Sequence, residues 1–395
     1  MRGPYNRGRF ESDAGFVTFC VRGQRDESTG GLRRVASCRV AGTWRAQRHG
    51  CPAGVATRDV VCRLGTRIAR IPDQGGLDRS SSVRILVAGC AGFIGYHLTE
   101  RLLADGHEVI GVDNFCTGTR ANARALQAHS RFRLIEHDIT QPLSLAGPLD
   151  RIYDLACPAS PVDFGPRRLE ILAVCSRGVW ELLELARRSG ARLLHASTSE
   201  VYGDPLEHPQ REDYWGHVNP IGPRSCYDEG KRFAEALLMA YHRQYGLAVR
   251  IPRIFNTYGP NMRRDDGRAL PTFIDQALRG QPVTVHGDGR QTRSFCYVSD
   301  LVDGLVRLME SDVYEPVNLG NPEETTVLEA AQEVVRLTGS RSPIVHVPRP
   351  PDDPRVRRPD ITRARTLLGW EPRVGRSEGF ARTIQWFRAT LGESA

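Results

Sequence analysis

One stretch of sequence decides the fold of this chain: Val83-Arg84-Ile85-Leu86-Val87-Ala88-Gly89-Cys90-Ala91-Gly92-Phe93-Ile94-Gly95. Its apolar part, Val83–Ala88, is typical of a buried parallel strand, and Phe93–Ala104 has the apolar spacing of a helix. The G-x-x-G-x-x-G turn between them lets the chain turn sharply and bring its backbone close to a pyrophosphate. Such a pyrophosphate would lie at the positive end of the helix.

Strands and helices alternate beyond this turn. Further strands are expected at His107–Val112, Phe132–Glu136, Arg151–Ala156 and Arg192–Ala196, and helices at Arg168–Arg188 and Tyr227–Tyr245. This rhythm predicts an α/β fold with a doubly wound parallel sheet, a Rossmann domain, over residues 83–250. The remainder, with helices expected at Leu301–Met309, Val327–Leu337 and Thr362–Leu368, is predicted to form a smaller substrate-binding lobe over residues 251–392. Its elements are expected to interleave partly with the first domain.

An acidic residue at the end of the second predicted strand points to the cofactor. Asp113 lies 24 residues after Gly89. An acid at this place accepts hydrogen bonds from ribose hydroxyls and repels a 2′-phosphate. NAD is therefore expected in preference to NADP, with a simple turn or helix-cap acid as the alternative interpretation.

The distribution of charge argues against a nucleic-acid partner. The net charge is +8, and residues 1–82 carry 15 arginines and 7 acids, which leaves 39 basic and 39 acidic residues in 83–395. The body of the protein thus has no basic excess for binding phosphates. Residues 1–82 lack apolar periodicity and are expected to form a disordered, Arg-rich extension.

Membrane and metal roles are not expected either. No apolar run approaches the roughly 20 residues needed to cross a bilayer, and the N-terminus lacks a signal-peptide core. The ten cysteines show neither a C-x-x-C pair nor a Cys/His cluster at metal spacing. We therefore expect a cytoplasmic protein that uses no metal.

The only lysine of the chain lies in an informative place. Lys231 follows Tyr227 by four residues, so both side chains lie on one face of a helix. A phenol with a pKa of about 10 becomes a usable base when an ammonium and an oxidised nicotinamide lie beside it. The alternative is an ordinary surface pair, which the uniqueness of the lysine disfavours.

A hydroxyl cluster follows the strand Arg192–Ala196. Ser197-Thr198-Ser199-Glu200 is expected to face the cofactor crevice, where hydroxyls can bind the sugar hydroxyl that is oxidised. Glu200 could serve as an acid or a base. Simple turn chemistry is the alternative for the cluster.

Longer motifs resemble the UDP-glucuronate decarboxylases (UDP-xylose synthases), a group of the extended short-chain dehydrogenase/reductase family. They are Ala196-Ser-Thr-Ser-Glu-Val-Tyr-Gly-Asp204, Gly216-His-Val-Asn-Pro-Ile-Gly-Pro-Arg-Ser-Cys-Tyr-Asp-Glu-Gly-Lys-Arg232, Arg253-Ile-Phe-Asn-Thr-Tyr-Gly-Pro260, Gly287-Asp-Gly-Arg-Gln-Thr-Arg-Ser-Phe-Cys-Tyr-Val-Ser-Asp300, Val317-Asn-Leu-Gly-Asn-Pro-Glu-Glu324, Arg358-Pro-Asp-Ile361 and Leu368-Gly-Trp-Glu-Pro372. The resemblance covers residues 83 to about 390.

The resemblance implies a reaction. Tyr227, assisted by Lys231 and Thr198, would take the proton of the sugar 4-hydroxyl while hydride passes from C4 to NAD. The 4-keto product is a β-keto acid that can lose its carboxylate as carbon dioxide, and hydride return then gives UDP-xylose. Ser199 and Glu200 would lie near the carboxylate, and Arg293 would hold the substrate.

The resemblance also implies the binding residues and the assembly. The cofactor-binding residues would be Gly89, Gly92, Phe93, Ile94, Gly95, Asp113, Asn114, Thr117, Gly118, Asp138, Ile139, Leu155, Ala196, Tyr227, Lys231 and Thr257. The substrate-binding residues would be Arg188, Tyr241, Gln244, Asn256, Arg268 and Arg293. A homodimer is expected through the helices Arg168–Arg188 and Tyr227–Tyr245.

The chain departs from the family pattern at several positions, and two of these departures bear on the site. Ala173-Val174-Cys175 stands where the family has Lys-Thr-Asn, and Asp154 replaces a histidine in the fourth strand. Two alternatives therefore stay open: a nucleotide-sugar 4,6-dehydratase or 4-epimerase, and a homologue that binds NAD and a nucleotide sugar without turnover. A dehydratase would usually carry Thr-Asp-Glu where this chain has Thr198-Ser199-Glu200.

Overall fold

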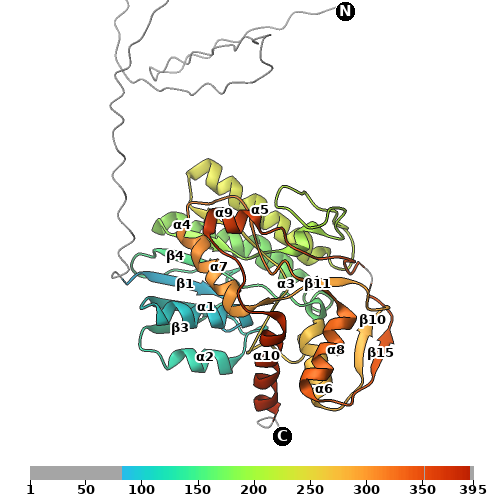
Figure 1. Cartoon of the computed structure of the whole chain (residues 1–395). Helices are drawn as coiled ribbons and strands as arrows, with labels where there is room; N and C mark the ends of the chain where they lie inside the picture. The colour runs from blue at the N-terminus through green and yellow to red at the C-terminus, as the bar shows by residue number, and fades with distance from the viewer. Residues whose placement is uncertain (1–81, 351, 392–395) are drawn as a thin grey trace, which may run out of the picture. The chain divides into compact units, whose positions relative to one another are not determined.

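The structure is a computed structural model that describes residues 82–350 and 352–391. The predicted disordered extension lies, apart from Ser82, outside the described residues. Figure 1 shows the helices and strands of the described part, many of them with the labels used below.

Six parallel strands form the central sheet in the order β3-β2-β1-β4-β5-β7. Their bounds are β1 (Arg84–Ala88), β2 (Glu108–Asp113), β3 (Phe132–Glu136), β4 (Arg151–Asp154), β5 (Arg192–His195) and β7 (Val249–Arg250). The strand order reverses at β1, and ligands of such sheets bind outside the carboxyl ends at this point. The predicted doubly wound sheet is confirmed.

The alternation of side chains along β1 explains why helices cover both faces of the sheet. Ile85 and Val87 enter one apolar core, and Leu86 and Ala88 enter another. The first core is completed by α1 (Phe93–Ala104), α2 (Arg120–Gln127) and α7 (Val298–Glu310), the second by α4 (Val179–Ser189) and α5 (Ser225–Tyr245). Figure 1 shows α4 and α5 on one side of β1 and α1 and α2 on the other.

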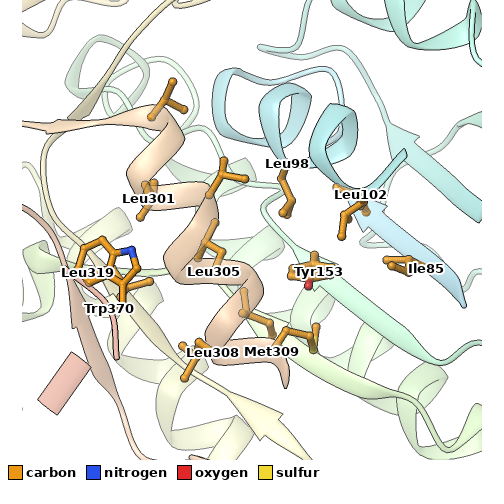
Figure 2. Packing of buried hydrophobic residues seen from close by; sticks show 14 of the residues in the cluster. Ile85, Leu98, Leu102, Tyr153, Leu301, Leu305, Leu308, Met309, Leu319 and Trp370 are labelled. Atoms are coloured by element: carbon orange, nitrogen blue, oxygen red, sulfur yellow. The ribbon is translucent and has the colours of Figure 1, made fainter. Parts of the chain in front are cut away.

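Helix α7 belongs to the second predicted domain by sequence but packs with the first. Leu301 and Leu305 of α7 share a core with Leu98 and Leu102 of α1 and with Ile85 of β1, as Figure 2 shows. An element beyond residue 250 thus shares a core with β1 and α1.

The smaller lobe has its own core. Phe273, Phe380 and Phe387 are buried between α6 (Ala269–Leu278), α8 (Val327–Thr338) and α10 (Arg376–Leu391). Beside them lie the paired strands β10 (Val283–His286) and β15 (Ile344–Val347). The remaining elements are β6 (Ser197–Thr198), β8 (Pro252–Ile254), β9 (Thr257–Tyr258), β11 (Thr292–Ser294), β12 (Cys296–Tyr297), β13 (Val317–Leu319), β14 (Glu324–Thr326) and α9 (Thr362–Leu368).

The long helix expected at Arg168–Arg188 is interrupted by a wide turn. It consists of α3 (Arg168–Ala173), the π-helical turn η2 (Val174–Gly178) and α4. Such π-turns are rare and frequently occur at functional sites. The turn falls on the segment that departs from the family pattern, and it contains the buried Cys175.

Candidate active site

A cavity of about 430 Å³ lies at the carboxyl ends of the sheet and extends to the smaller lobe. All sixteen predicted cofactor-binding residues, from Gly89 to Thr257, line it. So do the catalytic candidates Thr198, Ser199, Glu200 and Arg293, together with Asn256 and Arg268. One cavity thus brings together residues that are spread over 205 positions of the sequence.

The glycine turn after β1 has a geometry that other residues cannot adopt without strain. Gly89 has φ +80°, in the left-handed region, and a Cβ atom at Gly95 would lie 1.9 Å from the carbonyl oxygen of Gly89. The turn is therefore tight, and its backbone and the start of α1 border the cavity. This is the arrangement that receives the pyrophosphate of a dinucleotide.

Asp113 joins two loops at the cofactor end of the cavity. Its carboxylate accepts backbone hydrogen bonds from Ala91 at 2.9 Å and from Phe115 at 2.8 Å. Burial raises the pKa of Asp113, and these two hydrogen bonds act in the opposite direction. Because each carboxylate oxygen can accept more than one hydrogen bond, the site retains acceptors for ribose hydroxyls. The residues present therefore fit NAD.

Helix α5 carries Tyr227 and Lys231 one turn apart, facing the cavity. Tyr227 is 6% exposed, and the Nζ atom of Lys231 lies 5.9 Å from the centre of its ring. Burial raises the pKa of the Tyr227 phenol above its usual range, while Lys231 and a hydrogen bond with Thr198 lower it. The phenol is thus protonated at neutral pH in this arrangement, and a further positive charge beside it would favour loss of the proton.

Two buried side chains behind Lys231 hold its ammonium in place. The Nζ atom donates to the carbonyl oxygen of Ala196 at 2.8 Å and lies 3.4 Å from Nε2 of His195. His195 Nδ1 is 2.6 Å from the carboxylate of Asp154, and both residues are 2% exposed. An ammonium only donates, so Nε2 accepts and Nδ1–H donates to Asp154.

Burial and neighbouring groups determine the protonation states of His195 and Lys231. Burial lowers the pKa of His195, as does the positive charge of Lys231, so the imidazole is neutral. Burial alone would lower the pKa of Lys231, but Cys157, Cys175, Tyr227 and Asp154 together raise it. The ammonium is therefore charged at neutral pH. The sequence analysis noted Asp154 only as a departure and missed His195.

Glu200 is held by two arginines that the sequence analysis did not single out. Its carboxylate accepts from Arg224 at 2.7 Å and from Arg357 at 3.3 Å. Burial opposes ionisation, but Arg357 and Arg224, with Arg293 nearby, lower the pKa of Glu200 to about 2. Glu200 is thus ionised near neutral pH, which fits a base or a fixed negative charge and does not fit a proton donor.

Arg293 and Arg268 border the substrate end of the cavity with part of their hydrogen-bonding capacity used. Arg293 donates to both carboxylate oxygens of Asp353 at 2.9 Å, and to the carbonyl oxygens of Thr292 and Pro354. Arg268 donates to the carbonyl oxygen of Ala159 at 2.8 Å. Both guanidinium groups are therefore fixed before a ligand binds.

Three predicted substrate-binding residues, Arg188, Tyr241 and Gln244, do not line this cavity. The hydroxyl of Tyr241 donates to Glu184 at 2.7 Å, and the amide of Gln244 donates to the hydroxyl of Tyr245. Arg188 borders a separate small hollow. Tyr241 comes 14 residues after Tyr227 on α5. At a helical rise of about 1.5 Å per residue, this places it roughly 21 Å away from Tyr227 along the helix.

The comparison with protein families agrees with this geometry. The model of the NAD dependent epimerase/dehydratase family matches residues 85–320, more than half of the chain. The chain belongs to this family. The expected cofactor, NAD, is confirmed with it.

Within the NAD dependent epimerase/dehydratase family, the chain is similar to relatives that share one printed activity. The chain is 54% identical over 326 residues to UDP-glucuronic acid decarboxylase 1 of Danio rerio, which covers 82% of this chain and 78% of the relative. It is also 54% identical over 313 residues to UDP-glucuronic acid decarboxylase 5 of Arabidopsis thaliana. This match covers 79% of this chain and 91% of the relative.

The fold of the chain is similar to that of a solved structure. UDP-glucuronic acid 4-epimerase from Bacillus cereus, in complex with UDP-glucuronic acid and NAD, is 29% identical with a TM-score of 0.69. The match covers 78% of this chain and 99% of that one. The predicted resemblance to the UDP-glucuronate decarboxylase group of this family is therefore confirmed by relatives at much higher identity.

In residues 82–350 and 352–391, no group of three or more His, Cys, Asp or Glu side chains is arranged to hold a metal ion. Within the same ranges, no helix has both the length and the apolar character needed to span a bilayer.

Proposed function

We propose that this chain converts UDP-glucuronate to UDP-xylose by oxidation at C4, decarboxylation and reduction. The observation that carries the proposal is the meeting of Tyr227, Lys231 and Thr198 with an arginine-rich cluster in one cavity that also fits NAD. The relatives at 54% identity are named UDP-glucuronic acid decarboxylases, which supports this substrate.

Tyr227 is the proposed base. Its phenolate form would take the proton of the C4 hydroxyl, and Lys231 would stabilise that form by its charge. Thr198, which hydrogen-bonds Tyr227, would share the binding of the same oxygen. NAD, when bound beside them, would supply the hydride acceptor for C4 and the hydride donor at the end of the cycle.

The same two hydroxyl groups would also assist the loss of carbon dioxide. Decarboxylation of a β-keto acid leaves an electron pair that delocalises onto the ketone oxygen at C4. In the proposed binding mode, Tyr227, protonated at that stage, and Thr198 would donate hydrogen bonds to this oxygen and stabilise its negative charge. The chain therefore needs no metal ion to polarise the ketone.

The polar end of the cavity suits an anionic sugar nucleotide. Arg224, Arg293 and Arg357 line it there with Glu200 and Asp353. Asp228, 3.9 Å from Arg224, and Arg349, 3.6 Å from Asp353, extend this network of ion pairs. The Nε and Nη1 atoms of Arg357 are buried without a hydrogen-bond partner. We propose that this cluster, with Arg268 and Asn256, binds the anionic groups of the substrate.

We further propose that the enzyme is a cytoplasmic homodimer. Among the described residues, the six cysteines are free thiols, which suits a reducing compartment. The surface of α3, α4 and α5 exposes the apolar side chains Leu169, Leu172, Trp180, Phe233 and Tyr245. A second copy of this surface is the proposed occupant, because such an isologous contact would cover both sets at once.

Product analysis tests the proposed reaction. The chain is incubated with UDP-glucuronate and NAD, and the nucleotide sugars are identified by NMR and mass spectrometry. UDP-xylose or its 4-keto precursor is expected, and Tyr227→Phe should abolish both. UDP-galacturonate, or unchanged substrate with the wild-type chain, would refute the proposal in favour of an epimerase or a binding protein.

A further inference from the structure

Two cysteines that the proposed reaction does not use lie side by side at the active site. The Sγ atoms of Cys157 and Cys175 are 3.6 Å apart. Cys157 lies in the loop after β4 and lines the cavity, whereas Cys175 is fully buried in the π-turn η2. A molecule in the cavity can thus reach one thiol, and that thiol touches the other.

The pair packs directly against the turn of α5 that carries the catalytic candidates. A Cβ atom at Gly230 would lie 3.0 Å from the Cβ of Cys175 and 3.2 Å from its Sγ. Gly230 precedes Lys231, and Cys175 shares an apolar cluster with Tyr227. A displacement of Cys175 would therefore change the packing around Tyr227 and Lys231.

The surroundings favour one thiolate in the pair. The two sulfurs share a hydrogen bond in which either can be the donor, and this bond lowers the pKa of Cys175 although burial opposes it. The same hydrogen bond, together with burial, raises the pKa of Cys157. Lys231 favours the thiolate at either sulfur. The hydrogen bond and Lys231 thus favour loss of one of the two thiol protons, and the two sulfurs share the proton that remains.

We propose that Cys157 and Cys175 are a site of reversible oxidation, at which a hydroperoxide converts the two thiols to a disulfide and thereby stops turnover. Once the pair has lost one proton, the remaining proton can lie on Cys175, so that Cys157, which lines the cavity, is the thiolate. This thiolate attacks the O–O bond, which yields a sulfenic acid and, after protonation, an alcohol or water. Cys175, as thiolate, then attacks that sulfur, the S–S bond forms and water leaves. Two thiols lose two electrons and two protons, and the peroxide gains them.

The geometry makes this reaction a short movement. A disulfide requires an S–S distance of about 2.05 Å, so the sulfurs must approach by roughly 1.5 Å. The loop after β4 and the wide turn η2 would share this movement, which would change the packing of Cys175 against Gly230. The effect on turnover rests on the proposed function, whereas formation of the bond does not.

Peptide mapping and activity together test the inference. The full chain is treated with one to three equivalents of hydrogen peroxide at neutral pH, digested without reduction, and analysed by mass spectrometry. We expect a Cys157–Cys175 linked peptide, at least a tenfold loss of UDP-xylose formation, and recovery with dithiothreitol. Cys175→Ser should form no linked peptide and should keep its own rate through the treatment.

Cys226 provides the matched control, because it lies in the same cluster but donates to the carbonyl oxygen of Phe164. Cys226→Ser should still form the Cys157–Cys175 bond. Free or over-oxidised Cys157 in the treated wild-type chain, or a linked peptide with an unchanged rate, would overturn the inference. If UDP-glucuronate is no substrate, the linked peptide still tests formation of the disulfide. A change in NADH binding after peroxide treatment then tests its effect on the site.

Discussion

At the scale of residues, the buried Asp154–His195 pair gives the lone lysine a defined position. Burial of a carboxylate and an imidazole lowers the stability of the fold unless their polar atoms are hydrogen-bonded. Here Asp154 accepts from His195, and His195 lies next to the ammonium of Lys231. The pair thus fixes the ammonium that lowers the pKa of Tyr227.

Substitution of Asp154 tests this role. Asp154→Leu removes the acceptor of His195 Nδ1–H, so the ring and Lys231 lose their fixed orientation. We expect kcat to fall about tenfold, which corresponds to about 1.4 kcal/mol in the barrier. Asp154→Asn retains an acceptor oxygen and should lie close to wild type. Equal losses in both variants would contradict the positioning role.

The low pKa of Glu200 predicts a pH dependence. A carboxyl whose folded pKa, about 2, is below its unfolded value contributes stability above that unfolded value, and this stability is lost as the pH falls through the folded pKa. Glu200 is therefore ionised over the working range. In Glu200→Gln we expect kcat to fall about 10–100-fold while the acid limb of the pH–rate profile stays in place. A shifted limb in this variant would show that Glu200 titrates during the reaction.

At the scale of elements, the sequence predicted what local pattern controls. The glycine turn, β1, α1 and α5 were found because apolar period and turn residues are local signals. Helices α2, α6 and α10 were not predicted. Arg357 was missed because its role depends on Glu200, 157 residues away in sequence, and such a contact leaves no local signal.

Helix α7 ties the two lobes together, which predicts a large effect of core truncation. Leu305 is fully buried against the face of the sheet that α1 covers. Leu305→Ala should lower the free energy of unfolding by about 2–5 kcal/mol, because it leaves a cavity in this core. Leu367→Ala, at a side chain that is 53% exposed, serves as the control and should cost less than about 0.5 kcal/mol. Chemical denaturation measures both, and similar losses would argue against a shared core.

At the scale of the whole molecule, the exposed apolar surface of α3–α5 predicts the oligomeric state. Phe233, which is 48% exposed on α5, should lie inside the proposed dimer interface. Phe233→Glu would bury a charge there, so light scattering should report a monomer. Leu367→Glu, of similar exposure on α9, should remain dimeric. A monomeric wild-type chain would contradict the proposed assembly.

The central claim is that one cavity oxidises C4, releases the carboxylate and reduces the same carbon again. It is tested most directly with UDP-glucuronate that carries deuterium at C4. Carbon dioxide and UDP-xylose are expected in equal amounts, with the deuterium still at C4. UDP-xylose without the deuterium, or deuterium retained in a nucleotide sugar that still has its carboxylate, would contradict it.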